Sequence, residues 1–345
     1  MNDVIGLGPG RSASSTVVSA VVLTYQRLEL LPACLDSVQE ALSRLDCPAE
    51  IVVVDNGSPE QFATTRIGEL CQQARIVTLK ENRGYAGGLH AGLAVAQGEW
   101  ILTIGDDATI EPPAVVAMLA AGRSADDIGS VAATMLFADR SNGDVVNSAG
   151  LDIDRLGTAV DRWVGASAAY AETETTEVFG TSGGAALYRQ AMLDDIGGFD
   201  TSFGVYLEDA DVAWRARMAG WRCLLEPRAV VRHHHSATTR HRSDSKYFHV
   251  GRNRVRMLAK NATGTQLLRY APLIVLYDLA YVVYALLVDR TTAPIRGRLE
   301  GLREWRRYRG AQHVRRPVEL ARARGLRAAL GRNAAVRMPG SDPRS

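Results

Sequence analysis

The chain has 345 residues, of which 46% are hydrophobic and 23% are charged, and its formal net charge at pH 7 is +2. This composition is ordinary for a globular protein and argues against global disorder. The length accommodates one large α/β domain with an appendage, or two domains, and we find no internal repeat.

Basic residues are concentrated near the C-terminus. From Asp289 to the last residue there are 15 arginines and five acidic residues, whereas the preceding region is slightly acidic. Such an asymmetry favours contact with anionic lipid headgroups or another polyanion, although a solvated arginine-rich tail explains the same composition. Both interpretations stay open, and nucleic acid is not among the expected partners.

The four cysteines, Cys34, Cys47, Cys71 and Cys223, form no C-x-x-C pair and no metal-ligand spacing. They are typical of a reducing cytoplasmic compartment, in which cysteine serves as a small buried apolar residue. The first residues, MNDVIGLGPGRSASST, lack a basic segment followed by an apolar one, so no secretory signal is expected. Their glycine and serine content predicts a disordered lead-in over residues 1–16.

The chain then alternates between short apolar runs and amphipathic segments. These predict strands at 17–25, 50–58, 75–81 and 100–105, and helices at 30–45, about 59–73 and 90–97. Repeated strand–helix steps imply a parallel, doubly wound sheet with helices on both faces. The polar clusters TYQR, DNGS, ENRGYAGG and GDDAT stand at the strand ends, where ligands of such sheets bind.

The second half of the chain is less regular. Residues of about 138–180 are rich in Gly, Asp and Thr, and VYLEDADVAWRARMAGW at 205–221 predicts a loop that leads into an amphipathic helix. Residues 271–288 are mostly apolar with one charge, Asp278, and their length lies at the lower limit for a membrane span. A crossing helix, a helix lying on or re-entering the membrane and a buried core helix all fit this pattern.

Two adjacent acids, Asp106 and Asp107, follow the strand ILTIG. Successive side chains of an extended chain point to opposite sides, so the two carboxylates should not face the same ion. A D-x-D arrangement would place two acids on one side, but the position two before Asp107 is Gly105. The stretch is therefore either a metal site with one carboxylate or an acidic turn. A dinucleotide site is not expected, because no G-x-G-x-x-G joins the first strand to its helix.

The order of these clusters resembles that of the family-two glycosyltransferases over about residues 17–260. Strands ending in TYQR, DNGS and an acid, together with the N-R-G-Y-A-G-G turn, follow the family's order. FDTSFGVYLEDADVAWRARMAGW is similar to the pattern F-D-x-x-F-x-x-x-x-E-D-x-D-x-x-x-R-x-x-x-x-G of the rhamnosyltransferase-like branch, and RHHHSATT and GRNRVRMLAKNA resemble later segments of that branch. The resemblance implies a GT-A fold, with a Rossmann-like, mostly parallel sheet, that uses a nucleotide-diphosphate sugar.

The resemblance implies roles on the donor side. Asp55 matches the acid that accepts a hydrogen bond from N3–H of a uracil or thymine ring. Asp107 matches the second D-x-D acid, which holds Mg²⁺ or Mn²⁺ against the diphosphate, and His233 lies where a further metal ligand often occurs. No cysteine or spaced acid completes a zinc site beside His233. The other residues expected at the nucleotide sugar are Thr24, Tyr25, Arg27, Asn82, Arg83, Gly84, Gly87 and Asp106.

On the acceptor side, the resemblance makes Asp209 the general base that takes the proton from the acceptor hydroxyl in an inverting transfer, and Glu208 would position the acceptor or the base. Residues expected near the acceptor or a diphosphate are Asp211, Arg252 and Arg254.

Several of these residues have structural alternatives. Carboxylates are favoured at a helix start, and Asp211 would anchor that helix. Tight-turn packing explains the glycines, loop capping explains Asp106, and a surface basic cluster explains the arginines.

The predicted organisation is a lead-in at 1–16, a GT-A domain at 17–265, a membrane-associated or packing helix at 266–290 and a basic tail at 291–345. The predicted function is inverting, metal-dependent transfer of a hexose, most plausibly L-rhamnose from dTDP-rhamnose, to a lipid-linked or polysaccharide acceptor in cell-envelope synthesis. The enzyme is expected in the cytoplasm, peripheral on the inner face of the cell membrane. Alternatives are a galactofuranose or other hexose transferase, a nucleotidyltransferase, and a non-catalytic GT-A-shaped scaffold or sugar-binding subunit.

Overall fold

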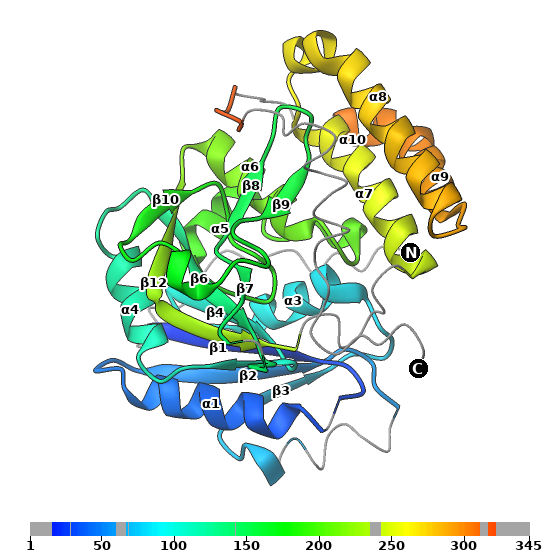
Figure 1. The fold of residues 1–345 in the computed structure, drawn as a ribbon. Coiled ribbons are helices and arrows are strands. Elements are labelled where there is room, and N and C mark those ends of the chain that lie inside the picture. Colours follow the sequence, from blue (N-terminus) through cyan, green and yellow to red (C-terminus); the bar gives the residue numbers. More distant parts are fainter. Residues whose placement is uncertain are drawn as a thin grey trace.

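The computed structural model describes residues 16–27, 29–59, 67, 69–141, 143–234, 243–310 and 317–321. Nearly all of the predicted lead-in, most of the helix expected at about 59–73 and most of the RHHHSATT segment therefore lie outside the described residues. A ten-stranded sheet forms the centre of the molecule, and helices cover both of its faces (Figure 1). The expected α/β architecture is confirmed.

The strands of the large sheet follow the order β10-β12-β6-β11-β4-β1-β2-β3, with β5 paired to β12 and β7 to β6, while β8 and β9 form a separate two-stranded sheet. Their bounds are β1 (Val18–Thr24), β2 (Ala49–Asp55), β3 (Arg75–Thr78), β4 (Trp100–Gly105), β5 (Ala108–Ile110), β6 (Ile128–Phe137), β7 (Val146–Ser148), β8 (Leu151–Ile153), β9 (Ala159–Asp161), β10 (Thr176–Val178), β11 (Ala185–Arg189) and β12 (Arg222–His233).

One half of the large sheet is parallel. Strand β1 pairs in parallel with β2 and β4, and β2 pairs in parallel with β3. Strands β1 and β4 are apolar and buried along their whole length, as expected for parallel strands covered on both faces. The register sets Thr24 opposite Asp55 and Leu23 opposite Gly105, so the carboxyl ends of three strands meet at one edge.

The other half of the sheet is mixed. Strand β11 runs antiparallel between β4 and β6, and β12 runs parallel to β6. The short strand β5, directly after the Asp106–Asp107 turn, pairs antiparallel with the end of β12, which sets His233 opposite Ala108. This pairing brings the end of β12 to the edge where β1, β2 and β4 end.

Helices α1 and α4 pack on one face of the sheet, and α3, α5 and α6 pack on the other. The helices are α1 (Leu31–Ser43), α3 (Gly84–Val95), α4 (Ala114–Gly122), α5 (Gln190–Ile196), α6 (Glu208–Ala219), α7 (Asp244–Asn261), α8 (Gly264–Leu287), α9 (Ala293–Arg303) and α10 (Trp305–Gly310), with 3-10 turns η1 (Ala168–Tyr170) and η2 (Thr201–Phe203).

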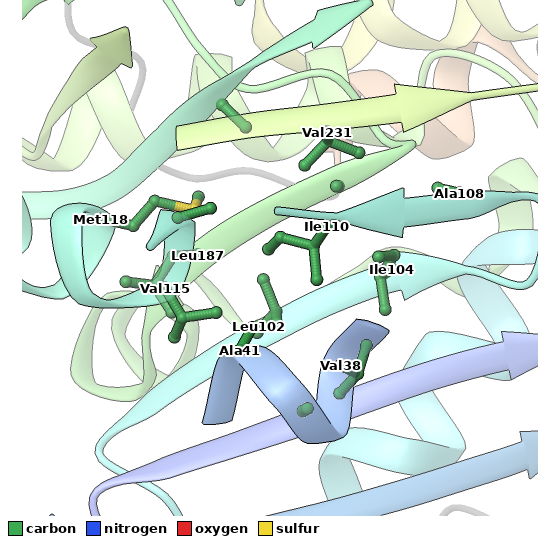
Figure 2. Close-up of a cluster of buried hydrophobic side chains, with 14 of the residues drawn as sticks. Val38, Ala41, Leu102, Ile104, Ala108, Ile110, Val115, Met118, Leu187 and Val231 are labelled. Carbon is green, nitrogen blue, oxygen red and sulfur yellow. The ribbon is translucent and has the colours of Figure 1, made fainter. Parts of the chain in front are cut away.

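The core beneath α1 and α4 is largely aliphatic, and Trp100 is its aromatic member. Each fully buried side chain of this kind stabilises the fold by about 1.5–3 kcal/mol. This face is therefore structural, and the polar residues gather at the carboxyl edge of the sheet instead. Members of the core labelled in Figure 2 are Val38, Ala41, Leu102, Ile104, Ala108, Ile110, Val115, Met118, Leu187 and Val231.

Helices α7 to α10 gather beside the domain, far from α1 (Figure 1). Helix α9 packs closely on α7. The two helices approach so closely at Gly297 that a Cβ there would lie 2.1 Å from the Phe248 carbonyl oxygen, which leaves room only for glycine. The predicted tail thus begins with two packed helices, α9 and α10. Ala321 then forms a β-bridge with Asp154, and residues 311–316 and 322–345 of that tail lie outside the described residues.

Candidate active site

The carboxyl ends of β1 and β4 are joined by Asp106. Its Oδ2 accepts a hydrogen bond from the Thr24 hydroxyl at 2.7 Å and another from the Tyr25 amide at 3.2 Å. Burial raises the pKa of Asp106 to about 6, and the charge of Arg27 works in the opposite direction. Asp106 therefore caps this junction, which is one of the two roles expected for it.

Asp55, the last residue of β2, carries an unpaired buried oxygen. The side chain is fully buried, and its Oδ1 accepts a hydrogen bond from the Ser58 amide at 3.0 Å. Its Oδ2 has no hydrogen-bond partner among the described residues. A buried acceptor without a partner costs about 1–3 kcal/mol, which a ligand carrying an N–H group would offset. This geometry fits the role implied for Asp55, which is to bind the uracil or thymine ring of the nucleotide.

An amide network shapes the turn that leads into α3. Asn56 accepts a hydrogen bond from the Arg83 amide at 3.0 Å and donates one to the Gly84 carbonyl at 3.0 Å. Asn82 accepts the Gly84 amide at 2.8 Å. The Arg83 side chain remains exposed at the start of the helix. Asn82 thus acts on the backbone of the turn, and the Arg83 side chain is exposed to solvent.

Close packing accounts for the glycines of this turn. Gly84 has a φ of +70°, and a Cβ there would lie 2.6 Å from the Gly204 carbonyl oxygen. Gly87 lies inside α3, where a Cβ would meet the Arg83 Cβ at 2.5 Å. The packing alternative is sufficient for both positions, so neither glycine needs a ligand to explain it.

Asp107 and His233 lie side by side because β5 pairs with the end of β12. His233 Nε2 is 3.4 Å from Asp107 Oδ1, and His233 Nδ1 is 2.9 Å from Asn147 Oδ1 on β7. Burial by itself would raise the pKa of Asp107. The hydrogen bond and charge of His233, with the charge of Arg27, outweigh burial and hold that pKa below its ordinary value.

The Asp107–His233 pair has the chemistry of an incomplete cation site. Asn147 Oδ1 is an acceptor, so His233 Nδ1 carries a hydrogen, and Nε2, which faces Asp107 Oδ1, would ligate a cation after giving up its own hydrogen. Within the described ranges, no group of three or more His, Cys, Asp and Glu side chains is placed to hold an ion. The residues fit Mg²⁺ or Mn²⁺ only if water and a diphosphate supply the other ligands.

Position 105 faces the same space as Asp107. A Cβ built on Gly105 would lie 2.9 Å from Asp107 Oδ1 and would meet no other heavy atom within 4 Å. An aspartate at position 105, the first acid of a D-x-D motif, would thus place its side chain beside Asp107. Its replacement by glycine leaves open space beside the carboxylate.

Glu208 and Asp209 are the first two residues of α6. Asp209 Oδ2 accepts the Gly183 amide at 2.9 Å, and Oδ1 accepts the Ala210 amide at 2.7 Å. Burial and then the charge of Asp161 raise the pKa of Asp209 to about 6. Burial and then the charge of Asp209 also raise the pKa of Glu208. Asp209 is consequently ionised at neutral pH and is a stronger base than an ordinary aspartate.

The Gly183–Gly184 turn lies between the two groups of acids. A Cβ on Gly183 would lie 3.4 Å from Asp209 Oδ2, and a Cβ on Gly184 would lie 3.5 Å from His233 Cε1. Tyr85 donates a hydrogen bond to the Gly183 carbonyl. Burial raises the pKa of Tyr85, and negative charges from both groups contribute to the shift. The structure therefore brings the predicted base and the predicted metal ligands into one site.

The backbone just before Glu208 is strained. Tyr206 and Leu207 have φ of 71° and 65°, in the left-handed region, which costs about 1–3 kcal/mol for each non-glycine residue. Asn253 of α7 is fully buried, and its Nδ2 lies 2.8, 2.9 and 2.8 Å from the carbonyl oxygens of Phe203, Val205 and Tyr206. One side-chain amide thus contacts three carbonyl groups of the turn that leads into the predicted pair, Glu208 and Asp209.

Three of the site's side chains were not found from the sequence. Asn147 and Asp161 belong to no recognisable motif, and Asn253 lies in the GRNRVRMLAKNA segment between the two predicted arginines, Arg252 and Arg254. Asp161 ends β9, and its Oδ1 is buried without a hydrogen-bond partner among the described residues. Burial raises its pKa, against hydrogen bonds from Ser148 and Ser182. Only the packing of β7, β9 and α7 on the site reveals these residues.

The predicted acceptor or diphosphate role of Asp211 is wrong. Its carboxylate is fully buried and accepts hydrogen bonds from Arg215 at 2.8 Å, Lys260 at 2.9 Å and Asn261 at 2.9 Å. Burial opposes the charge, but Arg215 and Lys260 outweigh it and lower the pKa of Asp211 to about 2. Asp211 ties α6 to α7, which is the anchoring alternative.

Neither predicted arginine is available to a diphosphate. Arg254 is 5% exposed, and its guanidinium donates to Asp278 at 3.0 Å and to the Gly157 carbonyl at 2.7 Å. Arg252 donates to the Phe203 carbonyl at 2.9 Å, beside the catalytic turn. Both arginines belong to α7, which packs beside the site. Their guanidinium groups hold the backbone carbonyls of Phe203 and Gly157 in place.

A mixed sheet of this topology, with acids at the carboxyl ends of its parallel strands, is that of a GT-A glycosyltransferase. The model of glycosyl transferase family 2 matches residues 19–197, and the chain belongs to this family. The matched range ends before Glu208 and Asp209. The family match therefore does not cover the predicted catalytic pair.

The fold has a solved counterpart in GalNAc-T7, crystallised with UDP, GalNAc and Mn²⁺. The TM-score is 0.58 at 13% sequence identity, and the alignment covers 75% of this chain and 51% of that protein. Identity at this level establishes the fold alone.

Among curated proteins, the uncharacterised protein y4gI of Sinorhizobium fredii is 26% identical over 235 residues, which are 65% of this chain and 25% of the relative. N-acetylglucosaminyl-diphospho-decaprenol L-rhamnosyltransferase of Mycobacterium tuberculosis is 38% identical over 58 residues, which are 17% of this chain and 19% of the relative. The aligned segments thus span a quarter or less of these relatives.

Proposed function

We propose that the protein is an inverting, metal-dependent glycosyltransferase in which Asp209 is the general base. The observation that carries the proposal is the placement of Asp209, with its raised pKa, across the Gly183–Gly184 turn from the Asp107–His233 pair. A base for the acceptor and ligands for a diphosphate-bound cation are the two elements that direct displacement at a sugar carbon requires.

In the proposed reaction, Asp209 takes the proton of the acceptor hydroxyl while that oxygen forms a bond to C1 of the donor sugar. The bond from C1 to the diphosphate breaks on the opposite face, and the nucleotide diphosphate leaves. Such a base contributes about 10²–10⁴ in rate. Asp107 and His233 would hold Mg²⁺ or Mn²⁺, which neutralises charge on the departing diphosphate when bound. Glu208, whose pKa is also raised by burial, would position the acceptor or the base.

We propose dTDP-L-rhamnose as the donor. The unpaired Asp55 Oδ2 is suited to the N3–H of a thymine ring. Thr24, Tyr25 and Arg27 would line the nucleotide pocket, because they follow the neighbouring strand at the same edge. The rhamnosyltransferase-like pattern around Asp209 and the resemblance to the mycobacterial rhamnosyltransferase support rhamnose as the sugar.

We propose a lipid-linked acceptor for cell-envelope glycan, used at the inner face of the cytoplasmic membrane. The similar mycobacterial protein carries a decaprenol-linked acceptor in its name. The apolar helix α8 and the arginine-rich C-terminal region suit an enzyme whose acceptor remains in a bilayer.

A donor and acceptor panel tests the proposal. Purified protein with Mn²⁺ would be given dTDP-L-rhamnose, UDP-galactofuranose or UDP-glucose, and a short-chain polyprenyl-diphospho-N-acetylglucosamine. We expect dTDP-L-rhamnose to raise the unfolding temperature and to yield a product of inverted anomeric configuration by NMR. EDTA should abolish donor binding, and undiminished binding in EDTA would contradict the metal role of Asp107.

The base is tested with Asp209→Asn against a control, Asp126→Asn, an exposed aspartate at the opposite end of the strands. We expect Asp209→Asn to lower the rate by about 10²–10⁴ with donor binding retained. The Asp126 variant should match the parent. Transfer by Asp209→Asn at the parent rate would rule out the assignment.

A further inference from the structure

Helix α8 has one face packed on the protein and one open face. In the part of the chain that the structure describes, it is the one helix long and apolar enough to cross a membrane, yet only 11% of its most apolar 18-residue window is buried. Ile274, Asp278 and Ala285 follow one another at helical spacing on the packed face. The most exposed leucines of the open face are Leu268 (84%), Leu276 (60%), Leu279 (58%) and Leu287 (75%).

Two buried arginines hold the middle of α8. Asp278 Oδ1 lies 3.0 Å from Arg254 Nε of α7 and 2.7 Å from Arg298 Nη2 of α9. Those arginine side chains are 5% and 11% exposed. The loop after α8 is also tied to α7, because Tyr247 donates a hydrogen bond to Asp289. The helix is therefore fixed along its packed face.

These contacts are incompatible with a membrane crossing. A helix of 24 residues is about 36 Å long, which would suffice for a hydrocarbon core of about 30 Å. Crossing would place Asp278 near the bilayer centre. Either α7 and α9 would enter the hydrocarbon with it, or Arg254 and Arg298 would lose their counter-ion inside the protein. The first outcome would carry the exposed arginines of α9 into the hydrocarbon, and the second would leave buried charges uncompensated, so α8 keeps its packed face on the protein.

The surface around the open face is basic. The most exposed charged residues of α8, α9, α10 and their described connections are arginines, and the acidic Glu300 side chain, which is 40% exposed, lies 3.7 Å from Arg252 of α7. Two further leucines of α9, Leu299 and Leu302, are 49% and 56% exposed. Apolar side chains bordered by arginines match the chemistry of an anionic membrane surface better than that of a neutral partner. The exposed arginines are Arg269, Arg290, Arg296, Arg303, Arg306 and Arg307.

We propose that α8 lies flat on an anionic membrane surface. Its open face would rest at the boundary of headgroups and acyl chains, about 5–10 Å into the interface, with the arginines of α8 to α10 against lipid phosphates. Helix α8 is thus the docking element, and its open face sets the orientation. The proposal rests on the proposed function only in one respect: a lipid-linked acceptor would explain why the enzyme is at a membrane. Vesicle binding can be measured with no donor or acceptor present.

The docking surface is linked to the catalytic turn through α7. Asn253 holds the carbonyl groups of the strained turn before Glu208, and the next residue, Arg254, holds Asp278 of α8. A membrane against α8 therefore sets the orientation of Asp209 relative to the lipid surface. This arrangement would present a lipid-linked acceptor to the base in one orientation.

Flotation with vesicles tests the proposal. The full chain would be mixed with phosphatidylcholine vesicles that contain or lack phosphatidylglycerol. We expect binding to the anionic vesicles, and we expect Leu276→Glu/Leu279→Glu to weaken it by about 100-fold, the combined contribution of two leucine side chains. Val116→Glu changes an exposed valine on α4 and is the matched control; it should bind as the parent does.

The charge contribution is tested with Arg303→Gln/Arg306→Gln. We expect a loss of roughly fivefold per arginine on anionic vesicles and little change on neutral ones. Equal binding of the parent, the leucine variant and the arginine variant would overturn the proposal. So would retention of the full chain in cell membranes after alkaline carbonate extraction, which indicates a crossing helix. A dimer that the leucine substitutions abolish, together with an absence of vesicle binding, would assign the open face to a second copy.

The same variants separate docking from catalysis. Leu276→Glu/Leu279→Glu should transfer sugar to a soluble acceptor at the parent rate, because the changed side chains face solvent. If vesicle binding is confirmed but no transfer occurs with any donor, the proposed function fails and the docking surface stands. If transfer occurs but vesicle binding does not, the docking proposal fails alone.

Discussion

The donor half and the catalytic half of the site are held together in different ways. The donor half lies at the ends of β1, β2 and β4, where main-chain pairing sets Thr24 beside Asp55. The catalytic half depends on single side chains, above all Asn253, which acts on Tyr206 across 47 residues. Pairing between strands does not depend on any one side chain, whereas the turn before Glu208 is held by two side chains of α7, Asn253 and Arg252. The catalytic half should therefore be the more sensitive to substitutions that never touch substrate.

Two asparagine variants, one in each half of the site, test this difference most directly. Asn253→Ala should release the strained turn and lower kcat by about 100-fold, because small misplacements of a catalytic group carry losses of this size. Donor affinity should be preserved. Asn56→Ala, which loosens the turn before α3, should weaken donor binding and leave kcat at saturating donor nearly unchanged. Titration of donor binding and steady-state kinetics on both variants check this, and identical profiles would contradict the division into two halves.

The next largest effect is expected where the two halves meet. Asn147 orients His233, so Asn147→Ala should weaken Mn²⁺ affinity by about 10–100-fold while donor binding at saturating Mn²⁺ remains. Mn²⁺ titration followed by donor-induced thermal stabilisation is the measurement. His233→Ala should behave in the same way and more strongly. If Asn147→Ala alters kcat but not Mn²⁺ affinity, Asn147 supports the Gly183–Gly184 turn instead.

A smaller effect is expected at Asp55. Asp55→Asn should weaken binding of a thymidine nucleotide by about tenfold. The amide has one oxygen in place of two, so its NH2 group can face the N3–H of the thymine ring where the carboxylate offers an acceptor. The free protein should lose no stability, since the change removes a charge whose Oδ2 has no protein partner in the described structure. Calorimetric binding of dTDP and urea unfolding of the free protein measure the two quantities. A large loss of stability with unchanged dTDP affinity would make Asp55 purely structural.

The smallest effect is a shift in pH dependence. Asp209 must be ionised to act as a base, so the rate should fall as pH decreases through about 6. The charge of Asp161 contributes to raising that pKa, so Asp161→Asn should move the acidic limb of kcat to lower pH. Asp161→Glu should restore the parent profile. Because burial also raises the pKa of Asp106 to about 6, donor binding must be followed separately over the same pH range.

Most of the donor half could be predicted from the sequence. Apolar runs followed by polar clusters mark the strand ends, and Thr24, Asp55 and Asp106 lie at the expected edge. The prediction for Asp106 and Asp107 followed from strand geometry, and the two residues do make different contacts: Asp106 binds the β1 loop, and Asp107 faces His233. These features depend on neighbouring strands, whose arrangement the alternation of elements already implies.

The acceptor half could not be predicted in the same way. Asp211 and Arg254 have the residue types of a polar binding site, yet both are buried in ion pairs that join helices. Exposure and partners depend on how α6, α7 and α8 pack, and a pattern of charges along the chain does not contain that information. For the same reason, the sequence of the apolar segment at 271–288 does not show that Asp278 pairs with arginines of α7 and α9.

The sequence by itself determined the α/β class, the order of the polar clusters and the family resemblance, because periodicity and motifs are local properties of the chain. Only the tertiary structure decided which charged residues face the site and which hold helices together. It also supplied Asn147, Asp161 and Asn253, whose role comes from contacts made across the fold. The physical reason is that a side chain's chemistry depends on its burial and its partners, and both are set when distant segments pack.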